Sequence, residues 1–307
     1  MTEPPDPGRR VLLPPPAARG DAPGDEFERL VEILRALRSP DGCPWDREQT
    51  LRSLAPFVQE EGAEVVDAIE RDDLEGLREE IGDLVFEGVF LAQLTAEAGH
   101  FSIVDSVRTV CEKLIRRHPH VFSQPPPPGT SASAVETAEH VVAQWADIKA
   151  REKASRGGTG GALEGVPVSL PALATARELG RKAAHEGFDW PTAGEVLDKV
   201  QEEIAELRAE LTGESGPSLD TAALARADEE IGDLFFALAQ LARKLGLDPE
   251  ASLRAANRKF RARFGALERT AMAEGIGDLA ALTLDQLEER WQRVKRSTPP
   301  SATTSAR

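Results

Sequence analysis

One acidic pattern occurs twice in this chain, and it restricts the possible fold more than any other feature. Each copy has two adjacent glutamates, a third glutamate three residues after the second, and a Glu-Ile-Gly-Asp sequence further on. Residues three or four positions apart lie on one face of an α-helix, so each copy predicts two carboxylate pairs on two neighbouring helices. The acids are Glu60, Glu61, Glu64, Glu80 and Asp83 in the first copy and Glu202, Glu203, Glu206, Glu230 and Asp233 in the second.

Each copy therefore predicts a magnesium site. Crowded carboxylates repel each other and would have to bind protons, whereas a hard divalent cation relieves the repulsion and prefers oxygen ligands. Magnesium is the first choice, with manganese as a substitute. The predicted metal ligands are Glu61, Glu64, Glu80 and Asp83 in the first copy and Glu203, Glu206, Glu230 and Asp233 in the second.

A solvated helix face with salt bridges is the alternative explanation of such acids. Two observations argue against it. Large apolar residues surround both Glu-x-x-Asp pairs, which places the acids at a core or a cleft, and the pattern recurs although the segment between its two parts is longer in the second copy. The apolar neighbours are Ile81, Leu84 and Val85 in the first copy and Ile231, Leu234, Phe235 and Phe236 in the second.

Composition narrows the class of protein. The length of 307 residues and the 40% hydrophobic content allow two domains, each with its own core. The net charge of -16 argues against a nucleic-acid polymer as partner, because there is no basic excess to replace its counterions. No apolar run is long enough to cross a bilayer, so no membrane partner is expected. The two cysteines and the lack of an apolar leader favour a reducing cytoplasm.

The chain is predicted to be all-α, with helical bundles in tandem. Apolar residues recur at spacings of three and four, as in amphipathic helices, and no segment alternates as a strand does. The expected helices are 25–38, 49–70, 73–98, 102–117, 135–153, 172–186, 193–212 and 221–246, followed by one that begins at Asp248-Pro249 with Asp248 as its cap. The last helix begins at Thr283, which forms a capping box with Gln286, and is expected to bury Leu284, Leu287, Trp291 and Val294.

Segments rich in proline and glycine divide the chain into two domains. Both ends, residues 1–24 and 297–307, are predicted to be disordered tails. The first domain is expected at 25–155 with a Pro-rich insertion at 124–134, the linker at 156–170 and the second domain at 171–296.

The repeat extends to basic residues. Lys113 and Arg117 are four positions apart, as are Lys259 and Arg263, so each pair predicts a two-pronged cationic face on one helix. Such a face could bind phosphate oxygens of a substrate, or its side chains could be ordinary solvated charges.

Tryptophans repeat as well. Trp145 and Trp291 follow the basic pairs and are expected to pack in the core, with stacking on a base as the alternative. Trp45 and Trp190 precede the acidic helices and could either line a substrate pocket or anchor a loop.

Several further motifs accompany the two acidic copies: Gly42-Cys43-Pro44-Trp45-Asp46, Arg116-Arg117-His118-Pro119-His120-Val121-Phe122, Gly187-Phe188-Asp189-Trp190 and Lys259-Phe260-x-x-Arg263-Phe264. With them, nearly all of residues 25–296 resembles the MazG family of nucleoside triphosphate pyrophosphohydrolases. The acidic motif alone also resembles the wider all-α pyrophosphatase group, which includes dimeric dUTPases and phosphoribosyl-ATP pyrophosphohydrolases.

The resemblance implies magnesium-dependent hydrolysis of a nucleoside triphosphate between its α and β phosphates, giving the monophosphate and pyrophosphate. Cleaning or controlling the nucleotide pool would be the physiological role. The resemblance also implies a homodimer of tandem helical domains.

When the family's motif is matched to this sequence position by position, the resemblance implies that the second acidic copy is the magnesium site of the second domain. The first copy would be the equivalent site of the first domain. Lys259 and Arg263 would bind the triphosphate, and Trp291 would lie near the nucleotide. Glu202 points about 100° away from Glu203 on the same helix, so orienting a water is a better role for it than binding metal. The Pro-rich insertion and the Arg-Arg-His-Pro-His sequence of the first domain make the second domain the better candidate for catalysis.

Hydrolysis of a phosphoanhydride mainly needs charge neutralisation and an aligned water, which carboxylate-bound magnesium with lysine and arginine can supply. Neither cysteine lies in the repeated motif, and the five histidines form no recurring set, which argues against covalent or zinc catalysis.

Two other functions use the same residues differently. A di-iron carboxylate bundle expects a Glu-x-x-His motif on each of two helices, and only Glu97 with His100 has that spacing. A helical binding protein could instead sense nucleotides without hydrolysing them, although the retention of both acidic sets disfavours this function.

Overall fold

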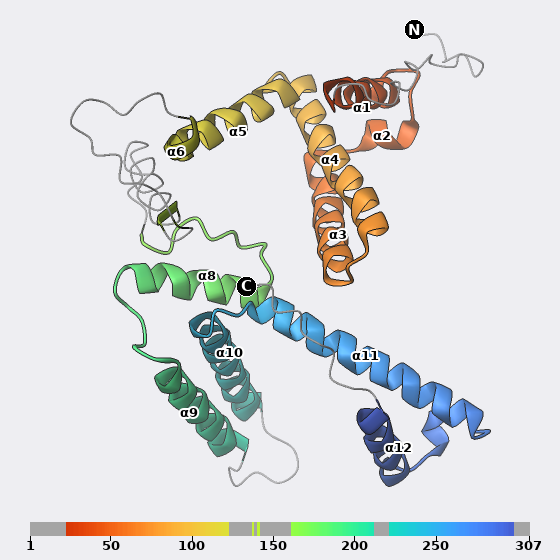
Figure 1. Ribbon diagram of the computed structural model, residues 1–307, viewed down its shortest axis with the longest axis vertical. Helices are drawn as coiled ribbons and strands as arrows, with labels where there is room; N and C mark the ends of the chain where they lie inside the picture. Colours follow the sequence, from red (N-terminus) through yellow and green to blue (C-terminus); the bar gives the residue numbers. More distant parts are fainter. Residues whose placement is uncertain (1–22, 123–136, 138–139, 142–160, 212–220, 298–307) are drawn as a thin grey trace. The chain divides into compact units, whose positions relative to one another are not determined.

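The computed structural model describes residues 23–122, 137, 140–141, 161–211 and 221–297. Within these ranges every regular element is a helix and no residue is in a strand, which confirms the predicted all-α class (Figure 1). Most of the helix expected at 135–153, Trp145 and the insertion at 124–134 lie outside the described residues, as do nearly all of the two predicted tails.

The chain divides into two compact units, Met1–Arg156 and Gly157–Arg307. The helices described in the first unit agree with the predicted ones to within two residues at each end, except for two short helices, at Pro44–Glu48 and Pro119–Phe122, that were not predicted. They are α1 (Pro23–Arg38), α2 (Pro44–Glu48), α3 (Leu51–Glu70), α4 (Leu74–Glu97), α5 (Ile103–Arg117) and α6 (Pro119–Phe122).

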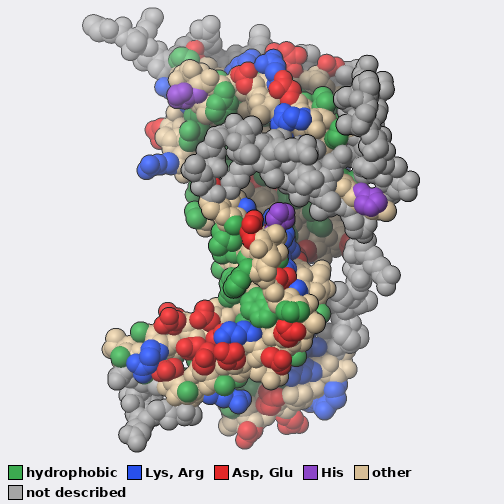
Figure 2. All heavy atoms as spheres, turned by 90° about the vertical axis from the view of Figure 1, so that its left-hand side faces the viewer, with side chains coloured by type: hydrophobic (Ala, Val, Ile, Leu, Met, Phe, Trp, Pro, Cys, Tyr) green, Lys and Arg blue, Asp and Glu red, His purple; other side chains and the backbone are tan. Residues whose placement is uncertain are grey.

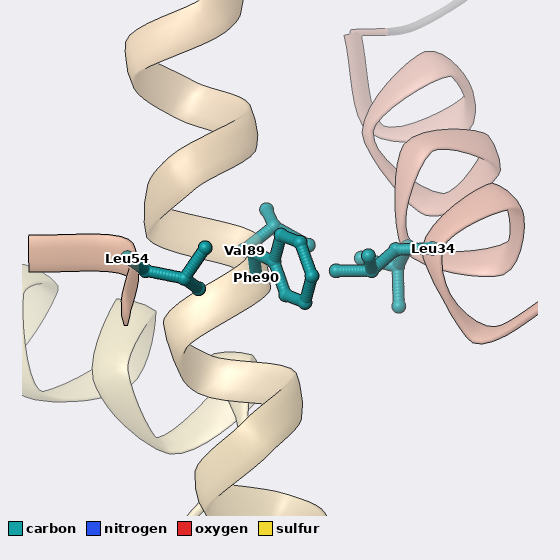
Figure 3. Packing of buried hydrophobic residues seen from close by; sticks show 5 residues of the cluster. Leu34, Leu54, Val89 and Phe90 are labelled. Carbon is teal, nitrogen blue, oxygen red and sulfur yellow. The ribbon is translucent and has the colours of Figure 1, made fainter. Parts of the chain in front are cut away.

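The core of the first unit forms where α1 and α3 pack against α4. Figure 3 shows Leu34 of α1 and Leu54 of α3 on opposite sides of Phe90, which lies on α4 beside Val89. Leu34, Leu54 and Phe90 have no exposed surface. This apolar contact holds α3 and α4 together at the level where the acidic residues begin.

The second unit has the predicted helix order. Its helices are α8 (Ala172–His185), α9 (Ala193–Leu211), α10 (Thr221–Lys244), α11 (Pro249–Ala273), the 3-10 helix η1 (Leu279–Ala281) and α12 (Leu284–Ser297). Asp248 caps α11 by accepting a bond from the N–H of Ala251 at 3.0 Å, as predicted. Thr283 and Gln286 form the predicted capping box of α12, with reciprocal bonds of 2.9 and 3.3 Å.

One packing prediction for α12 is wrong. Leu284 was expected in the core but is 80% exposed in the first turn of α12. Val294 is buried as expected, and Leu287 and Trp291 are half-buried.

The second unit has a polar group at the centre of its core. Gln240 of α10 is fully buried, donates to the carbonyl of Ala176 at 2.7 Å and accepts from the guanidinium of Arg243 at 2.7 Å. Gly180 of α8 lies directly against the Gln240 side chain, where a Cβ atom would not fit. The close contact of α8 with α10 therefore depends on a glycine facing a glutamine.

Candidate metal centres

The first unit brings three of its predicted ligands together. Helices α3 and α4 pack side by side, and Glu61, Glu64 and Glu80 each place a carboxylate oxygen within 4.8 Å of the others. Burial and the charges of neighbouring acids raise the pKa of Glu61 and of Glu80. Asp83 is not a member of this group, although its charge contributes to the raised pKa of Glu61.

A further acid, Glu87, belongs to this region and was missed in the sequence. It lies one helical turn beyond Asp83 on the same face of α4 and is only 7% exposed. Burial raises the pKa of Glu87, and the charges of Glu61 and Asp83 add to the increase. One oxygen of Glu87 and one of Glu61 are buried without a hydrogen-bond partner among the described residues. We name Glu61, Glu64, Glu80, Asp83 and Glu87 the first acidic cluster.

The second unit repeats the arrangement on α9 and α10. Carboxylate oxygens of Glu203, Glu206 and Glu230 lie within 4.8 Å of one another, and Glu203 is buried. Burial and the charges of Glu206 and Glu203 raise the pKa of Glu230; Asp233 acts on Glu230 in the same direction but is not in the group. We name Glu203, Glu206, Glu230 and Asp233 the second acidic cluster.

A lysine inside the second cluster was also missed. The ammonium group of Lys199 lies 2.8 Å from Glu203 and 2.9 Å from Glu202. Hydrogen bonds to these two carboxylates raise the pKa of Lys199. Lys199 precedes Glu203 by four positions, a spacing that places both side chains on one face of α9, so the signal was present in the sequence.

The predicted phosphate-binding residues of the second unit form a separate group. Lys259 and Arg263 lie on α11, and Trp291 of α12 packs against Phe260 with ring centroids 5.4 Å apart. In the part of the chain that the structure describes, no hydrogen bond or ion pair joins Lys259 or Arg263 to the second acidic cluster. The single chain therefore brings together the acids but leaves the predicted basic pair apart from them.

The remaining predicted residues differ in exposure. Lys113 and Arg117 are half-buried on α5, and Trp190 is half-buried just before α9. Trp45 is 52% exposed and its ring meets Phe57 of α3 edge-on at 5.9 Å.

The Glu97–His100 pair of the di-iron alternative has another explanation. Glu97 accepts bonds from the Arg38 guanidinium at 2.6 to 3.0 Å and from Gln93 at 2.9 Å, which lowers the pKa of Glu97. The Glu97 carboxylate joins α4 to α1, and both of its oxygens accept hydrogen bonds from Arg38.

Comparison with known proteins places the chain in a family. Residues 49–122 match the MazG nucleotide pyrophosphohydrolase domain. A nucleoside triphosphate pyrophosphohydrolase of Escherichia coli (strain K12) is 43% identical over 273 residues, which are 89% of this chain and 98% of that protein. This chain belongs to the MazG family. A nucleoside triphosphate pyrophosphohydrolase/pyrophosphatase MazG of Thermotoga maritima is 40% identical over 269 residues, 88% of this chain and 95% of that protein.

The MazG domain match includes the whole first acidic cluster and the Lys113–Arg117 pair. The alignment of 273 residues is longer than either unit, so it also extends over much of the second unit. Mycobacterium tuberculosis has a nucleoside triphosphate pyrophosphohydrolase that is 33% identical over 184 residues, 59% of this chain and 50% of that protein.

Charged side chains also lie on the surface of the second unit of this MazG-family chain. In the lower part of Figure 2, which shows the second unit, Asp and Glu side chains gather on the visible face with Lys and Arg among them.

Among the helices described, none is long and apolar enough to span a bilayer.

Proposed function

We propose that this chain is a metal-dependent nucleoside triphosphate pyrophosphohydrolase with its reaction centre at the second acidic cluster. The reaction converts a nucleoside triphosphate and water into the monophosphate and pyrophosphate. The observation that carries this proposal is the convergence of Glu203, Glu206 and Glu230, with Glu203 buried, in a chain that belongs to the MazG family. We further propose that the two units are the two copies of a duplicated MazG-like domain.

The residues of the second cluster fit a hard divalent cation, for which we propose magnesium, with manganese as a substitute. The donors are all carboxylate oxygens within 4.8 Å of one another, and oxygen is the ligand atom that magnesium and manganese prefer. When bound, the cation would neutralise phosphate charge and lower the pKa of the attacking water. The proposed ligands are Glu203, Glu206, Glu230 and Asp233.

The other residues of the second unit divide the remaining tasks. Glu202 is exposed and orients the attacking water, and Lys199 places a positive charge beside the carboxylates, where substrate phosphate oxygens would arrive. Lys259 and Arg263 bind the triphosphate chain, since a lysine and an arginine one turn apart offer several donors to phosphate oxygens. Trp291 and Trp190 line the nucleotide site.

A homodimer would complete the site. Large apolar side chains next to the acids are exposed in the single chain, among them Phe235 at 54% and Phe236 at 39% on α10. Exposed apolar side chains grouped in this way are typical of protein interfaces. We propose that a second copy covers them. Lys113 and Arg117 would be the first unit's equivalents of the basic pair.

The test is release of pyrophosphate and monophosphate from eight nucleoside triphosphates with magnesium. Glu203→Gln removes one ligand charge with little change in shape and is expected to lower kcat by roughly 1000-fold. Glu61→Gln makes the same change in the first cluster and serves as the matched control, with at most a few-fold loss expected. Absence of pyrophosphate from every nucleotide with the unmodified chain would overturn the proposal.

The atom attacked is settled by hydrolysis in water labelled with heavy oxygen. Attack at the α phosphorus places the label in the monophosphate, whereas attack at the β phosphorus places it in pyrophosphate.

A further inference from the structure

The turn that joins α8 to α9 (Figure 1) carries an exposed aromatic side chain. It contains the motif Gly187-Phe188-Asp189-Trp190, in which Gly187 adopts a φ of 86° that favours glycine. Phe188 is 80% exposed, whereas Asp189 and Trp190 are half-buried. Packing within the single chain therefore does not account for the ring of Phe188.

The turn is held in place by its backbone and by Asp189. The N–H of Phe188 donates to the carbonyl of Ala183 at the end of α8, at 3.0 Å. The Asp189 carboxylate is bonded to Arg243 at 2.5 Å and to Lys244 at 2.8 Å, both at the end of α10. Asp189 is therefore the side chain that anchors the turn, and the ring of Phe188 is left available for a ligand.

The first unit has a similar combination before its acidic hairpin. Trp45 is 52% exposed and precedes α3, and the adjacent Asp46 is only 7% exposed. The guanidinium of Arg38 donates to the backbone carbonyl of Asp46. Each unit therefore presents an exposed aromatic side chain beside an immobilised aspartate, just before the first helix of its acidic pair.

The turn of the second unit leads directly into the helix that carries Lys199 and Glu203. From Ala193, where α9 begins, to Lys199 the helix rises by about 9 Å. A nucleotide whose phosphates lie beside Lys199 can extend its base over such a distance towards the turn. Aromatic side chains stack on every kind of base, and a ring on a rigid turn loses little conformational freedom when it binds.

We propose that Phe188 stacks on the base of the nucleotide and that Asp189 is a positioning residue that holds this ring in place. The proposal rests on the function proposed for the second unit and adds to it the contact that recognises the base. A stacked ring contacts the base and not the phosphates. It therefore contributes to the binding of substrate and leaves the hydrolytic step unchanged.

Hydrolysis of ATP and of ribose triphosphate, which has the same phosphates but no base, tests the proposal. Phe188→Ala should raise KM for ATP roughly 5- to 150-fold, the equivalent of about 1–3 kcal/mol for one stacked base, with kcat unchanged. KM for ribose triphosphate should stay the same. Phe188→Trp keeps an aromatic ring and should preserve KM for ATP. Asp189→Asn should raise KM for ATP alone, because the turn loses its ion pairs with α10.

Leu284→Ala is the matched control, since Leu284 is an apolar side chain of the same unit with the same exposure of 80%. It should leave both KM values unchanged. If Phe188→Ala affects the two substrates equally, or leaves KM for ATP unchanged, the proposal is wrong. A shift of Phe188→Ala alone to a smaller species in sedimentation, with equal effects on both substrates, would show that the ring packs against a second copy instead.

Binding without turnover provides a second readout. A triphosphate with a fluorescent purine analogue as its base should lose fluorescence when it binds to the Glu203→Gln variant, because stacking on an aromatic ring quenches such bases. Adding Phe188→Ala to this variant should restore most of the fluorescence of the bound probe, and equal quenching without the ring would overturn the proposal. This readout decides the question even if the unmodified chain hydrolyses neither substrate, a result that would contradict the proposed function instead.

Discussion

The α3–α4 hairpin and the α9–α10 hairpin bring the same three acids within 4.8 Å but differ in what surrounds them. The second cluster contains a lysine bonded to its buried glutamate, whereas the first has an aromatic ring at that position and an additional buried glutamate. Identical acidic patterns can therefore belong to centres with different resting charge. The residues one turn before and after the pattern decide this difference.

The cores that support the two hairpins also differ, because one has an apolar residue where the other has a polar residue. The position of fully buried Phe90 in α4 corresponds to that of fully buried Gln240 in α10. The first core is held by apolar packing, and the second by hydrogen bonds from Gln240 to Ala176 and from Arg243 to Gln240.

Replacing the two central core residues tests this contrast most strongly. Phe90→Ala should destabilise the first unit by roughly 3–5 kcal/mol, since it removes a large buried ring. Gln240→Leu should cost the second unit roughly 1–3 kcal/mol, because the Ala176 carbonyl and the Arg243 guanidinium lose a buried partner. Hydrogen exchange read by mass spectrometry assigns each loss to its unit. A neutral Gln240→Leu would show that the polar core is not needed.

Removing the ammonium group of Lys199 tests whether the two acidic clusters differ in function. Lys199→Met should lower kcat/KM for triphosphate hydrolysis by roughly 100-fold, because a positive charge next to the reacting phosphates is lost. Phe57→Met changes the corresponding residue of the first unit and should have little effect. Equal losses in the two variants would contradict the assignment of catalysis to the second unit.

Lowering the pH is expected to have a smaller effect, on the free energy of unfolding of the second unit. Asp189, before α9, is bonded to Arg243 at 2.5 Å and to Lys244 at 2.8 Å, and these bonds hold its pKa at about 2, below the usual 3.8. A lowered pKa in the folded state gives stability that is present above pH 3.8 and is lost as the pH falls towards 2. The loss should be at most roughly 2 kcal/mol.

The measurement is urea unfolding of the second unit at pH 5 and at pH 2.5, with Asp189→Asn as the comparison. The variant should lack this part of the pH dependence. In the first unit, Glu97 and Arg38 give a pH dependence of the same sign, which Asp189→Asn should leave intact. If the variant keeps the full pH dependence of the second unit, the ion pairs of Asp189 are not its source.

Much of the fold could be predicted because its signals are local. Apolar periodicity located the longer described helices but not the short α2 and α6, and Asp248 and Thr283 marked the starts of α11 and α12, since a cap needs only residues within one turn. Leu284 was misplaced for the opposite reason. Whether one apolar residue on a helix is buried depends on where the neighbouring helix ends, which periodicity does not contain.

For the candidate site, too, features set within one helix could be predicted, whereas features set by packing between helices could not. Helical spacing paired the acids on each helix, but it named Asp83 and Asp233 as ligands of equal standing, and only the packing of two helices separates them from the closer groups. Glu87 was not predicted to belong to the site because it has no counterpart in the second copy, although it lies on the same face of α4 as Glu80. Lys199 was not predicted because it lies outside the acidic pattern.

The sequence by itself determined the helical class, the approximate boundaries of the longer helices, the duplicated acids and the family resemblance, because each depends on residue types and their spacing along the chain. Only the tertiary structure decided which carboxylates of neighbouring helices meet and that Glu87 is buried without a partner among the described residues. Both outcomes depend on distances between helices, which the spacing of residues along one helix does not contain.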